Sequence, residues 1–277
     1  MSITIKSDTA STIDFSIITF AGGERHVQLN EFDGNNVKRI DVIARLHNAS
    51  EIMDLLLVIN ALRHSASASA TIELTLPYLP YARQDRVCAA GQAFSLEAFA
   101  AVLSTLPINS LTTWDCHSEV GVALTGAINI TPEKIIASSP ALVSLLTHEN
   151  SVLVCPDKGA KPRCEAIKRR LNIRNSVQCC KKRDPSTGKI LKTEVNIDSL
   201  TGKTAVITDD ICDGGYTFIK IAEQLKAKGA DKVILYVTHG IFSKGLSVFD
   251  GLIDEIYTTD SFEREANDPR INPIKFA

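Results

Sequence analysis

Residues 204–217 read Thr-Ala-Val-Ile-Thr-Asp-Asp-Ile-Cys-Asp-Gly-Gly-Tyr-Thr. The apolar, β-branched run predicts a buried parallel strand, which leads through the paired acids Asp209 and Asp210 into a glycine turn and an amphipathic helix. Ligands of open α/β sheets bind at the carboxyl ends of the strands, and backbone N–H groups at a helix N-terminus favour anions. The turn at Gly214 and Gly215 suits a phosphate, and the acids suit sugar hydroxyls. The segment therefore predicts a site for a phosphorylated sugar.

The sequence of this region is also compatible with a helix cap and superficially resembles a P-loop. The segment could be an ordinary acidic turn in which Asp213 caps the following helix. Gly202-Lys203-Thr204 ends like a phosphate-binding P-loop, but the first glycine of that motif is absent and the tripeptide precedes the strand instead of following it. The P-loop interpretation is therefore excluded, whereas the capping alternative stays open at this stage.

Helical and strand patterns alternate along the chain. Residues 51–63 place apolar side chains on one helical face, and residues 70–76 alternate like a strand. The same order recurs late, with a helix expected over 217–228 and a strand over 232–238. This alternation predicts an α/β fold built on parallel sheets. It also suits a duplicated domain, although unrelated strand and helix units share this pattern.

The length of 277 residues fits two domains of ordinary size. Turn and helix-start signals in 130–139 separate two apolar blocks, so we expect domains at 1–135 and 136–277. A second polar interruption covers 184–203 and begins with a predicted exposed turn at 184–188.

Composition excludes several classes of function. A net charge of −2 provides no basic surplus for nucleic acid or an anionic membrane. Apolar stretches such as 55–59 are far too short to span a bilayer, and the N-terminus lacks the pattern of a secretory signal. We therefore expect a cytoplasmic protein that handles phosphate only locally.

Several motifs resemble those of a known family. The Asp-Asp-Ile-x-Asp-Gly-Gly-x-Thr segment resembles the ribose-phosphate loop of type I phosphoribosyltransferases and phosphoribosyl pyrophosphate synthetases. The stretch Pro-Tyr-Leu-Pro-Tyr-Ala-Arg-Gln-Asp-Arg at 77–86 is similar to a motif of the synthetases that ordinary transferases lack. Further matches in the synthetases' order and spacing are Phe20–Glu24, Asp115-Cys116-His117, Pro156-Asp157-x-Gly159 and Lys181-Lys182-Arg183, so that the resemblance spans about residues 15 to 260.

The resemblance implies a fold and an activity. The fold would consist of two similar type I phosphoribosyltransferase-like domains, each a mainly parallel sheet flanked by helices. The N-terminal domain would carry the ATP-side motifs, and the C-terminal domain would carry the ribose 5-phosphate and catalytic loops. The activity would be the Mg²⁺-dependent transfer of the diphosphoryl group of ATP to the C1 hydroxyl of ribose 5-phosphate, which yields phosphoribosyl pyrophosphate and AMP.

The resemblance also implies roles for individual residues. Lys181 and Arg183 would be catalytic, closing over the transferring group, and His117 and Asp157 would bind Mg²⁺ directly or through water. The family forms oligomers of at least two subunits that share the ATP site, because the 20–24 loop reaches a neighbouring subunit. The ATP-binding residues would be Phe20, Gly22, Gly23, Glu24, Arg83, Gln84, Asp85 and His117, and the ribose 5-phosphate-binding residues would be Asp209, Asp210, Asp213, Gly214, Gly215, Tyr216 and Thr217.

Four features depart from the family pattern. Gly22 stands where the family usually has aspartate, which puts the nucleotide preference in question. Tyr216 replaces a small residue, so its side chain must point away from the phosphate or narrow the pocket. Residues 87–94 are less basic than usual, and the chain ends soon after Phe262, which implies a shortened C-terminal tail.

Two alternative functions compete with the synthetase. A phosphoribosyltransferase would use the same sugar loop but would leave the 83–86 and 181–183 motifs without a role. A noncatalytic regulatory paralogue would keep the fold without the activity, although the joint presence of His117, Asp157 and Lys181 argues against it.

Overall fold

The structure is a computed structural model that describes residues 2–10, 12–183, 190–262 and 268–276, with the backbone alone for 181–183 and 190–193. Two compact units make up the chain, residues 1–130 (unit 1) and 131–277 (unit 2). Each unit has a hydrophobic core of its own. The division precedes the expected 135/136 boundary because the helix α4 (Pro132–Ala137) packs against helices of unit 2.

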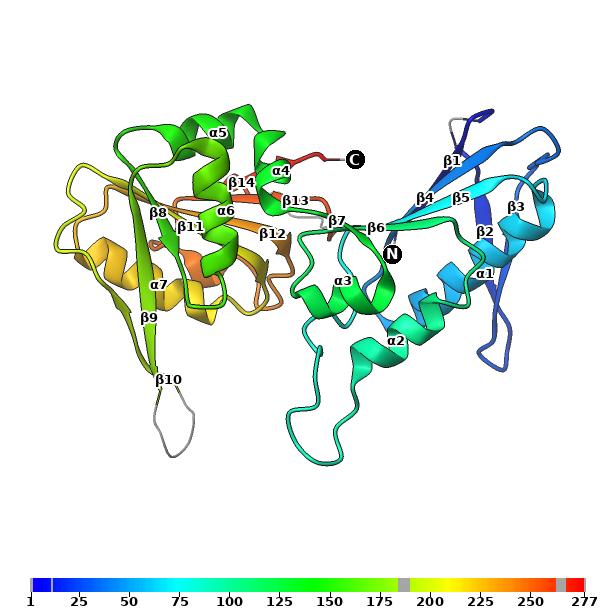
Figure 1. The fold of residues 1–277 in the computed structure, drawn as a ribbon, viewed down its shortest axis with the longest axis horizontal. Helices are drawn as coiled ribbons and strands as arrows, with labels where there is room; N and C mark the ends of the chain where they lie inside the picture. The colour runs from blue at the N-terminus through cyan, green and yellow to red at the C-terminus, as the bar shows by residue number, and fades with distance from the viewer. Residues whose placement is uncertain (1, 11, 184–189, 263–267, 277) are drawn as a thin grey trace. The chain divides into compact units, whose positions relative to one another are not determined.

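Unit 1 is built on a five-stranded sheet with the order β1-β4-β5-β6-β7 (Figure 1). The strand β1 runs antiparallel to β4, and the remaining neighbours are parallel. Helices connect the parallel strands, as the alternating sequence pattern predicted. The elements are β1 (Ser2–Ser7), β4 (Arg39–Arg45), α1 (Ala49–Ser65), β5 (Thr71–Leu76), α2 (Ser95–Leu103), β6 (Ser110–Trp114), α3 (Glu119–Thr125) and β7 (Ile128–Ile130).

The first helix shows how local sequence determines an element. Asn48 caps α1, because its side-chain oxygen accepts hydrogen bonds from the N–H groups of Ser50 and Glu51. The Glu51 carboxylate reaches back to the His47 N–H at 2.6 Å, which completes a reciprocal cap. The buried apolar residues of α1 pack in the core of unit 1, and the predicted helix over 51–63 is confirmed. The predicted strand over 70–76 is likewise confirmed by β5.

A separate two-stranded hairpin, β2 (Phe15–Thr19) and β3 (Arg25–Leu29), packs against α1. The guanidinium of Arg25 binds both carboxylate oxygens of Asp54 on that helix, at 2.7 and 2.5 Å. Asp54 is fully buried, so this ion pair compensates a charge that would otherwise be costly to bury. Arg25 is paired with Thr19, so the ion pair anchors the hairpin directly beside its 20–24 turn.

Unit 2 is built on a seven-stranded sheet with the order β10-β9-β8-β11-β12-β13-β14 (Figure 1). The neighbours are parallel except β9 and β10, which pair antiparallel. The elements are α5 (Pro140–Thr147), β8 (Ser151–Cys155), α6 (Lys161–Leu171), β9 (Ser176–Arg183), β10 (Ile190–Val195), β11 (Thr204–Cys212), α7 (Tyr216–Ala227), β12 (Lys232–Gly240), the 3-10 turn η1 (Ser247–Phe249), β13 (Glu255–Thr259) and β14 (Ile271–Ile274).

The strand β11 lies at the middle of this sheet and is buried along most of its length. It continues through both acids to Cys212, because it stays paired with β12 as far as Gly240. The acids that the sequence placed after the strand therefore belong to it, followed by its last two residues, Ile211 and Cys212. The helix and strand predicted over 217–228 and 232–238 are confirmed by α7 and β12.

The polar interruption expected over 184–203 is partly wrong. Residues 190–195 form β10, which pairs with β9, so the stretch contains a strand that its polarity concealed. The predicted turn at 184–188 lies outside the described residues. Edge strands carry polar side chains more readily than central ones, which explains why the hydrophobic pattern did not reveal this one.

The sheets of the two units have a similar arrangement of parallel strands. Each contains four parallel strands that follow one another in the sheet, β4-β5-β6-β7 in unit 1 and β8-β11-β12-β13 in unit 2. The expected α/β class with two similar, mainly parallel units is confirmed. No helix within the described residues is both long enough and apolar enough to cross a lipid bilayer.

Candidate active site

The topology of unit 2 determines where a ligand can bind. From β8 the chain crosses through α6 to β9 on one side, whereas from β11 it crosses through α7 to β12 on the other side. The strand order therefore reverses between β8 and β11, whose carboxyl ends lie next to each other. Such a switch point leaves a crevice outside the strand ends and is the usual ligand site of doubly wound sheets.

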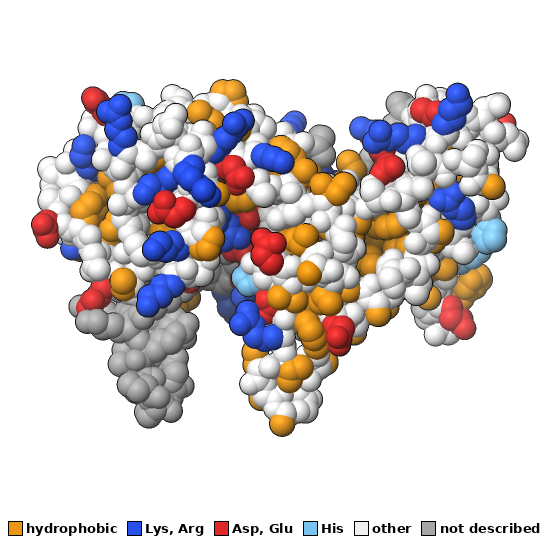
Figure 2. Space-filling view, viewed as in Figure 1, with side chains coloured by type: hydrophobic (Ala, Val, Ile, Leu, Met, Phe, Trp, Pro, Cys, Tyr) orange, Lys and Arg blue, Asp and Glu red, His pale blue; other side chains and the backbone are white. Residues whose placement is uncertain are grey.

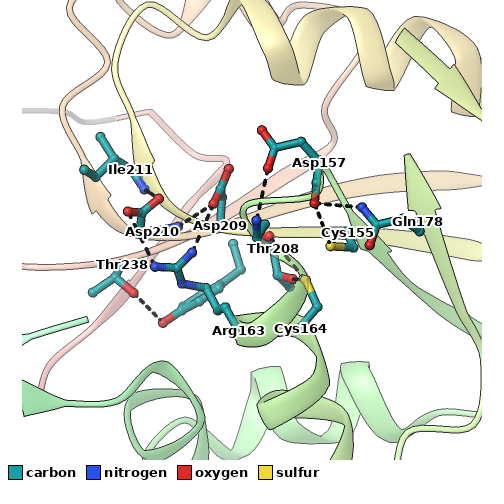
Figure 3. Close-up of polar contacts among 12 residues, drawn as sticks. Cys155, Asp157, Arg163, Cys164, Gln178, Thr208, Asp209, Asp210, Ile211 and Thr238 are labelled. Carbon is teal, nitrogen blue, oxygen red and sulfur yellow. Dashed lines mark hydrogen bonds and ion pairs between the residues drawn. The ribbon is translucent and has the colours of Figure 1, made fainter. Parts of the chain in front are cut away.

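Paired carboxylates and one arginine meet at this switch point (Figure 3). Arg163, from the first turn of α6, directs Nη1 to Asp209 Oδ1 and Nη2 to Asp210 Oδ2, both at 3.5 Å. Backbone N–H groups also bind the acids, since Asp210 N donates to Asp209 Oδ1 at 3.0 Å and Ile211 N donates to Asp210 Oδ1 at 2.9 Å. The two acids are thus held in one orientation at the end of β11.

The surroundings of Asp209 disfavour the charged form of its carboxyl group. Burial raises the pKa of Asp209 well above its usual range, the neighbouring Asp210 charge raises it further, and Arg163 opposes both effects. The charge of Asp157 adds to the rise. A displaced carboxylate pKa in a crevice is typical of functional sites.

Asp157 follows β8 at the other side of the switch point. Its Oδ1 accepts a hydrogen bond from Ala160 N at 3.0 Å, which shapes the turn into α6. Its carbonyl oxygen accepts from Gln178 Nε2 at 2.7 Å and from the Cys155 thiol at 3.3 Å. The 157–161 turn is therefore anchored to both neighbouring strands, and its position does not depend on a bound ligand.

The glycine turn links β11 to α7. Gly215 adopts a left-handed conformation with φ of 80° and is the N-cap of α7, without a side-chain capping bond. Asp213 instead accepts a hydrogen bond from Ser243 Oγ at 2.6 Å, so the interpretation of Asp213 as a helix cap is wrong. The turn thus directs the first N–H groups of α7 outward without a competing side chain, as an anion site requires.

Tyr216 does not obstruct the glycine turn. Its side chain is 63% exposed, and the Lys220 ammonium lies 6.0 Å from the ring centroid. Of the two expectations for this departure, the structure supports the one in which the ring points away from the turn.

Unit 1 brings a second group of predicted residues together. A pocket of about 440 Å³ lies beside the 83–86 motif, a size within the range of small-molecule sites. Tyr81 and Asp115, which flank its motifs, have φ of 63° and 40°, a strained conformation that often marks functional loops. The lining residues are Arg83, Gln84, Asp85, Arg86, Cys88, Gln92, Ala93, Ser95 and His117.

Asp85 has a structural part in this pocket. Arg86 Nε donates to its Oδ1 at 2.8 Å, and this hydrogen bond holds the pKa of Asp85 below its usual value. The carboxylate is buried and stays ionised, whereas Arg86 is largely exposed. We infer that Asp85 orients the motif, in which Arg83 and His117 line the same pocket.

The hairpin tip forms its own turn. Phe20 N donates to the Glu24 carbonyl at 2.9 Å, and Gly23, with φ of 89°, closes the turn back onto Phe20. The Phe20 side chain is 53% exposed, and none of the residues 20–24 lines the 440 Å³ pocket. Within unit 1, the structure therefore does not join Phe20, Gly22, Gly23 and Glu24 with the other predicted ATP-binding residues.

The remaining predicted residues are placed only in part. Lys181 and Arg183 lie on β9, and their side chains are outside the described residues. Among the residues that the structure describes, no group of three or more metal-ligating side chains is poised around a common centre. His117 belongs to unit 1 and Asp157 to unit 2.

Sequence reasoning missed two residues that the structure places at the site. Ser243 binds Asp213 from the loop after β12, and no local pattern signals this contact. Arg163 had a weak signal, because the first turn of α6 contains cations and no acid, although a helix N-terminus disfavours positive charge. A cation at that position indicates nearby acids.

Replacing Asp209 by asparagine should raise the free energy of unfolding at pH 7, because the folded chain would no longer hold a buried, ionisable carboxyl. Folding raises the pKa of Asp209, so the folded chain holds the proton more tightly than the unfolded chain does. The free energy of unfolding therefore falls as the pH rises from the usual aspartate range to the raised pKa. Asparagine cannot ionise and escapes this loss. Urea unfolding between pH 4 and 8 measures the effect.

The gain in stability should shrink toward pH 4, because the unfolded chain also takes up the proton as the pH falls through the usual aspartate range. Asp198→Asn, which alters an exposed acid, serves as the control and should shift stability by less than about 0.5 kcal/mol at every pH. An asparagine variant at 209 that is less stable than wild type at pH 7 would contradict the prediction.

The topology and the site define the class of protein. A doubly wound sheet with an acid pair and a glycine turn at its switch point is the arrangement of a phosphoribosyltransferase-type domain, and residues 129–256 match the family described as the phosphoribosyl transferase domain. Residues 5–106 match the N-terminal domain of ribose phosphate pyrophosphokinase.

Comparisons over the whole chain are more specific. The chain is 32% identical over 251 residues to a ribose-phosphate pyrophosphokinase of Mycoplasmopsis pulmonis, covering 88% of this chain and 75% of that protein. It is 30% identical over 251 residues to the enzyme of Shewanella oneidensis, covering 87% and 76%. A solved phosphoribosylpyrophosphate synthetase from Mycobacterium smegmatis shares the fold, with a TM-score of 0.79 at 22% identity over 96% of this chain and 87% of that one. The chain belongs to the ribose-phosphate pyrophosphokinase family.

Proposed function

We propose that this protein is a ribose-phosphate diphosphokinase, which transfers the diphosphoryl group of ATP to the C1 hydroxyl of ribose 5-phosphate and releases phosphoribosyl pyrophosphate and AMP. The observation that carries the proposal is the juxtaposition, at the switch point of unit 2, of an acid pair and a helix N-terminus without a side-chain cap. Family membership supports the diphosphokinase over the phosphoribosyltransferase and the noncatalytic paralogue.

The sugar phosphate would bind at the end of β11. The carboxylates of Asp209 and Asp210 would accept hydrogen bonds from the ribose hydroxyls, and residues 213–217 would surround the 5-phosphate with backbone N–H groups. Tyr216 contributes its N–H group while its ring stays in solvent. The 157–161 turn would face the diphosphate side of the product.

ATP would bind through the motifs of unit 1. Arg83 and Gln84 line the 440 Å³ pocket with His117, and the arginine would neutralise phosphate charge. Phe20 would stack on the adenine with its exposed ring, in the ATP site of a neighbouring subunit, which makes the active protein at least a dimer. Gly22 offers no side chain to the base, so ATP need not be the preferred nucleotide.

Mg²⁺ prefers oxygen ligands, and the Asp157 carboxylate at the switch point of unit 2 is a ligand of that kind. His117 and Asp157 would hold the ion directly or through water, and triphosphate oxygens would complete its shell, as is usual for Mg²⁺ at nucleotide sites. The bound ion would neutralise charge on the triphosphate and orient it.

The chemical step is a nucleophilic displacement at phosphorus. The C1 hydroxyl oxygen forms a bond to the β-phosphorus, the bond from the β-phosphorus to the α,β-bridging oxygen breaks, and that oxygen leaves with AMP. The hydroxyl proton passes to solvent. Lys181 and Arg183 are assigned to the charge that develops on the transferring group, because phosphoryl transfer depends on positioning and cations more than on covalent catalysis.

The test follows ATP in the presence of Mg²⁺, with and without ribose 5-phosphate, and quantifies AMP. AMP should form only when ATP, Mg²⁺ and ribose 5-phosphate are all present, and its amount should equal that of phosphoribosyl pyrophosphate. Intact ATP in the complete mixture would overturn the proposal and favour the noncatalytic paralogue. Release of pyrophosphate from phosphoribosyl pyrophosphate and a nucleobase would instead identify a phosphoribosyltransferase. Repeating the complete mixture with other nucleoside triphosphates measures the consequence of Gly22.

A further inference from the structure

The first turn of α6 has an unusual charge. It contains Lys161 and Arg163 and no acid, although the helix dipole disfavours cations at this end. Figure 2 shows that lysine and arginine side chains gather over this face of unit 2, where Arg169 and Arg170 of the last helical turn are exposed. Arg163 differs from them, because its side chain is only 13% exposed. Its burial needs a compensating partner.

That partner is the acid pair of β11. The guanidinium of Arg163 directs one nitrogen to each carboxylate, at 3.5 Å in both cases, and does not grip a single carboxylate with both nitrogens. Asp209 Oδ1 also accepts the backbone N–H of Asp210, and none of these contacts uses Asp209 Oδ2 (Figure 3). The arrangement orients both acids toward the same guanidinium.

The base of the arginine side chain is held in place. The next residue, Cys164, lies with its Sγ 3.4 Å from Thr208 Oγ1, and Thr208 immediately precedes Asp209. Both Cys164 and Thr208 are buried. Neighbouring residues of α6 therefore contact neighbouring residues of β11, which holds the first turn of α6 beside the acid pair.

Without the arginine, the acids could not keep this arrangement. Three carboxylates, those of Asp157, Asp209 and Asp210, act on one another at the switch point, and Arg163 is the cation whose charge opposes them at Asp209. Like charges this close repel one another, so side chains that lack a compensating cation tend to turn apart. Such a rotation removes an acceptor from one of the two positions.

We propose that Arg163 is a positioning residue that holds Asp209 and Asp210 for the vicinal hydroxyls of the sugar, and that it thereby determines the preference for ribose 5-phosphate over 2-deoxyribose 5-phosphate. The inference rests on the proposed function, because it takes the sugar phosphate to bind at the acid pair. A site that hydrogen-bonds a hydroxyl rejects an analogue that lacks it, because its polar groups are then left unpaired.

The test measures dissociation constants of both sugar phosphates by calorimetry for wild type and Arg163→Gln. Wild type should bind ribose 5-phosphate at least about 10-fold more tightly than the deoxy sugar. Arg163→Gln should weaken ribose 5-phosphate about 10-fold and bring the ratio of the two constants close to one. Arg170→Gln removes the same charge from the exposed last turn of α6 and should leave both constants unchanged.

The positioning role would be wrong if Arg163→Gln left the ratio of the two dissociation constants unchanged, including the case in which both sugars bind more weakly by the same factor. Arg163 would then have a structural role. Arg163→Lys keeps the charge but not the planar fork, and it should give an intermediate ratio, even where the glutamine variant fails to fold. Binding is measured without ATP, so its outcome is independent of AMP formation. A changed ratio in a chain that forms no AMP would support the role of Arg163 while the proposed reaction fails.

Discussion

Gly215→Ala is expected to lower the free energy of unfolding of unit 2 by about 3 kcal/mol and to weaken ribose 5-phosphate binding at least about 100-fold. The glycine has φ of 80°, which is strained for any side chain. A Cβ there would also lie 2.6 Å from Cζ of Phe249, whose side chain is fully buried and cannot withdraw. The turn would have to move, and the first N–H groups of α7 would move with it.

The neighbouring glycine is the matched control for this prediction. A Cβ on Gly214 would approach Lys244 Cγ at 3.5 Å and Ser243 Oγ at 4.0 Å, both ordinary van der Waals distances, and its φ lies outside the left-handed region. Gly214→Ala should therefore cost less than about 1 kcal/mol. Urea unfolding and calorimetric titration with ribose 5-phosphate measure both variants. Equal effects at the two positions would refute the assignment of the constraint to Phe249.

Lys181→Ala is expected to lower kcat about 1,000-fold while the dissociation constant of ribose 5-phosphate changes less than about 3-fold. The reason is chemical: a cation that stabilises charge on the transferring diphosphoryl group matters in the transition state far more than in the bound ground state. AMP formation at saturating substrates measures kcat, and calorimetry measures the binding of the sugar.

Lys182→Ala is the control for this variant, because it removes the same charge from the same basic run at a position without an assigned role. Its kcat should stay within about 3-fold of wild type. If Lys181→Ala retained full activity, or if both variants lost it equally, the catalytic assignment of Lys181 would be wrong.

Most of the helices and strands at the site were predictable because their signals are local. The cap at Asn48, the alternation before Pro77 and the order of strand, glycine turn and helix in 204–217 depend on residues within a few positions of one another. Backbone conformation and burial period follow from such neighbours. The strand β10 escaped because an edge strand needs no apolar face.

The functional motifs were identified from local sequence, whereas their contacts with distant residues were not. The 83–86 motif and His117 were identified in the sequence, and the structure adds that they line one pocket. Asp213 was identified as well, but its hydrogen bond to Ser243 arises because β12 lies beside β11 and brings its loop next to the glycine turn. The side chains of Lys181 and Arg183 lie outside the described residues, so their assignment remains a prediction.

The sequence by itself therefore determined the α/β class, the acid pair at a strand end, the phosphate-accepting turn and, through the order of its motifs, the family. Only the tertiary structure decided that Arg163 faces Asp209 and that Gly215, not Gly214, carries the constraint. The physical reason is sequence separation: Arg163 meets an acid 46 residues away, and Gly215 packs on a ring in a later loop. Such contacts depend on the order of strands in the sheet, which no local pattern specifies.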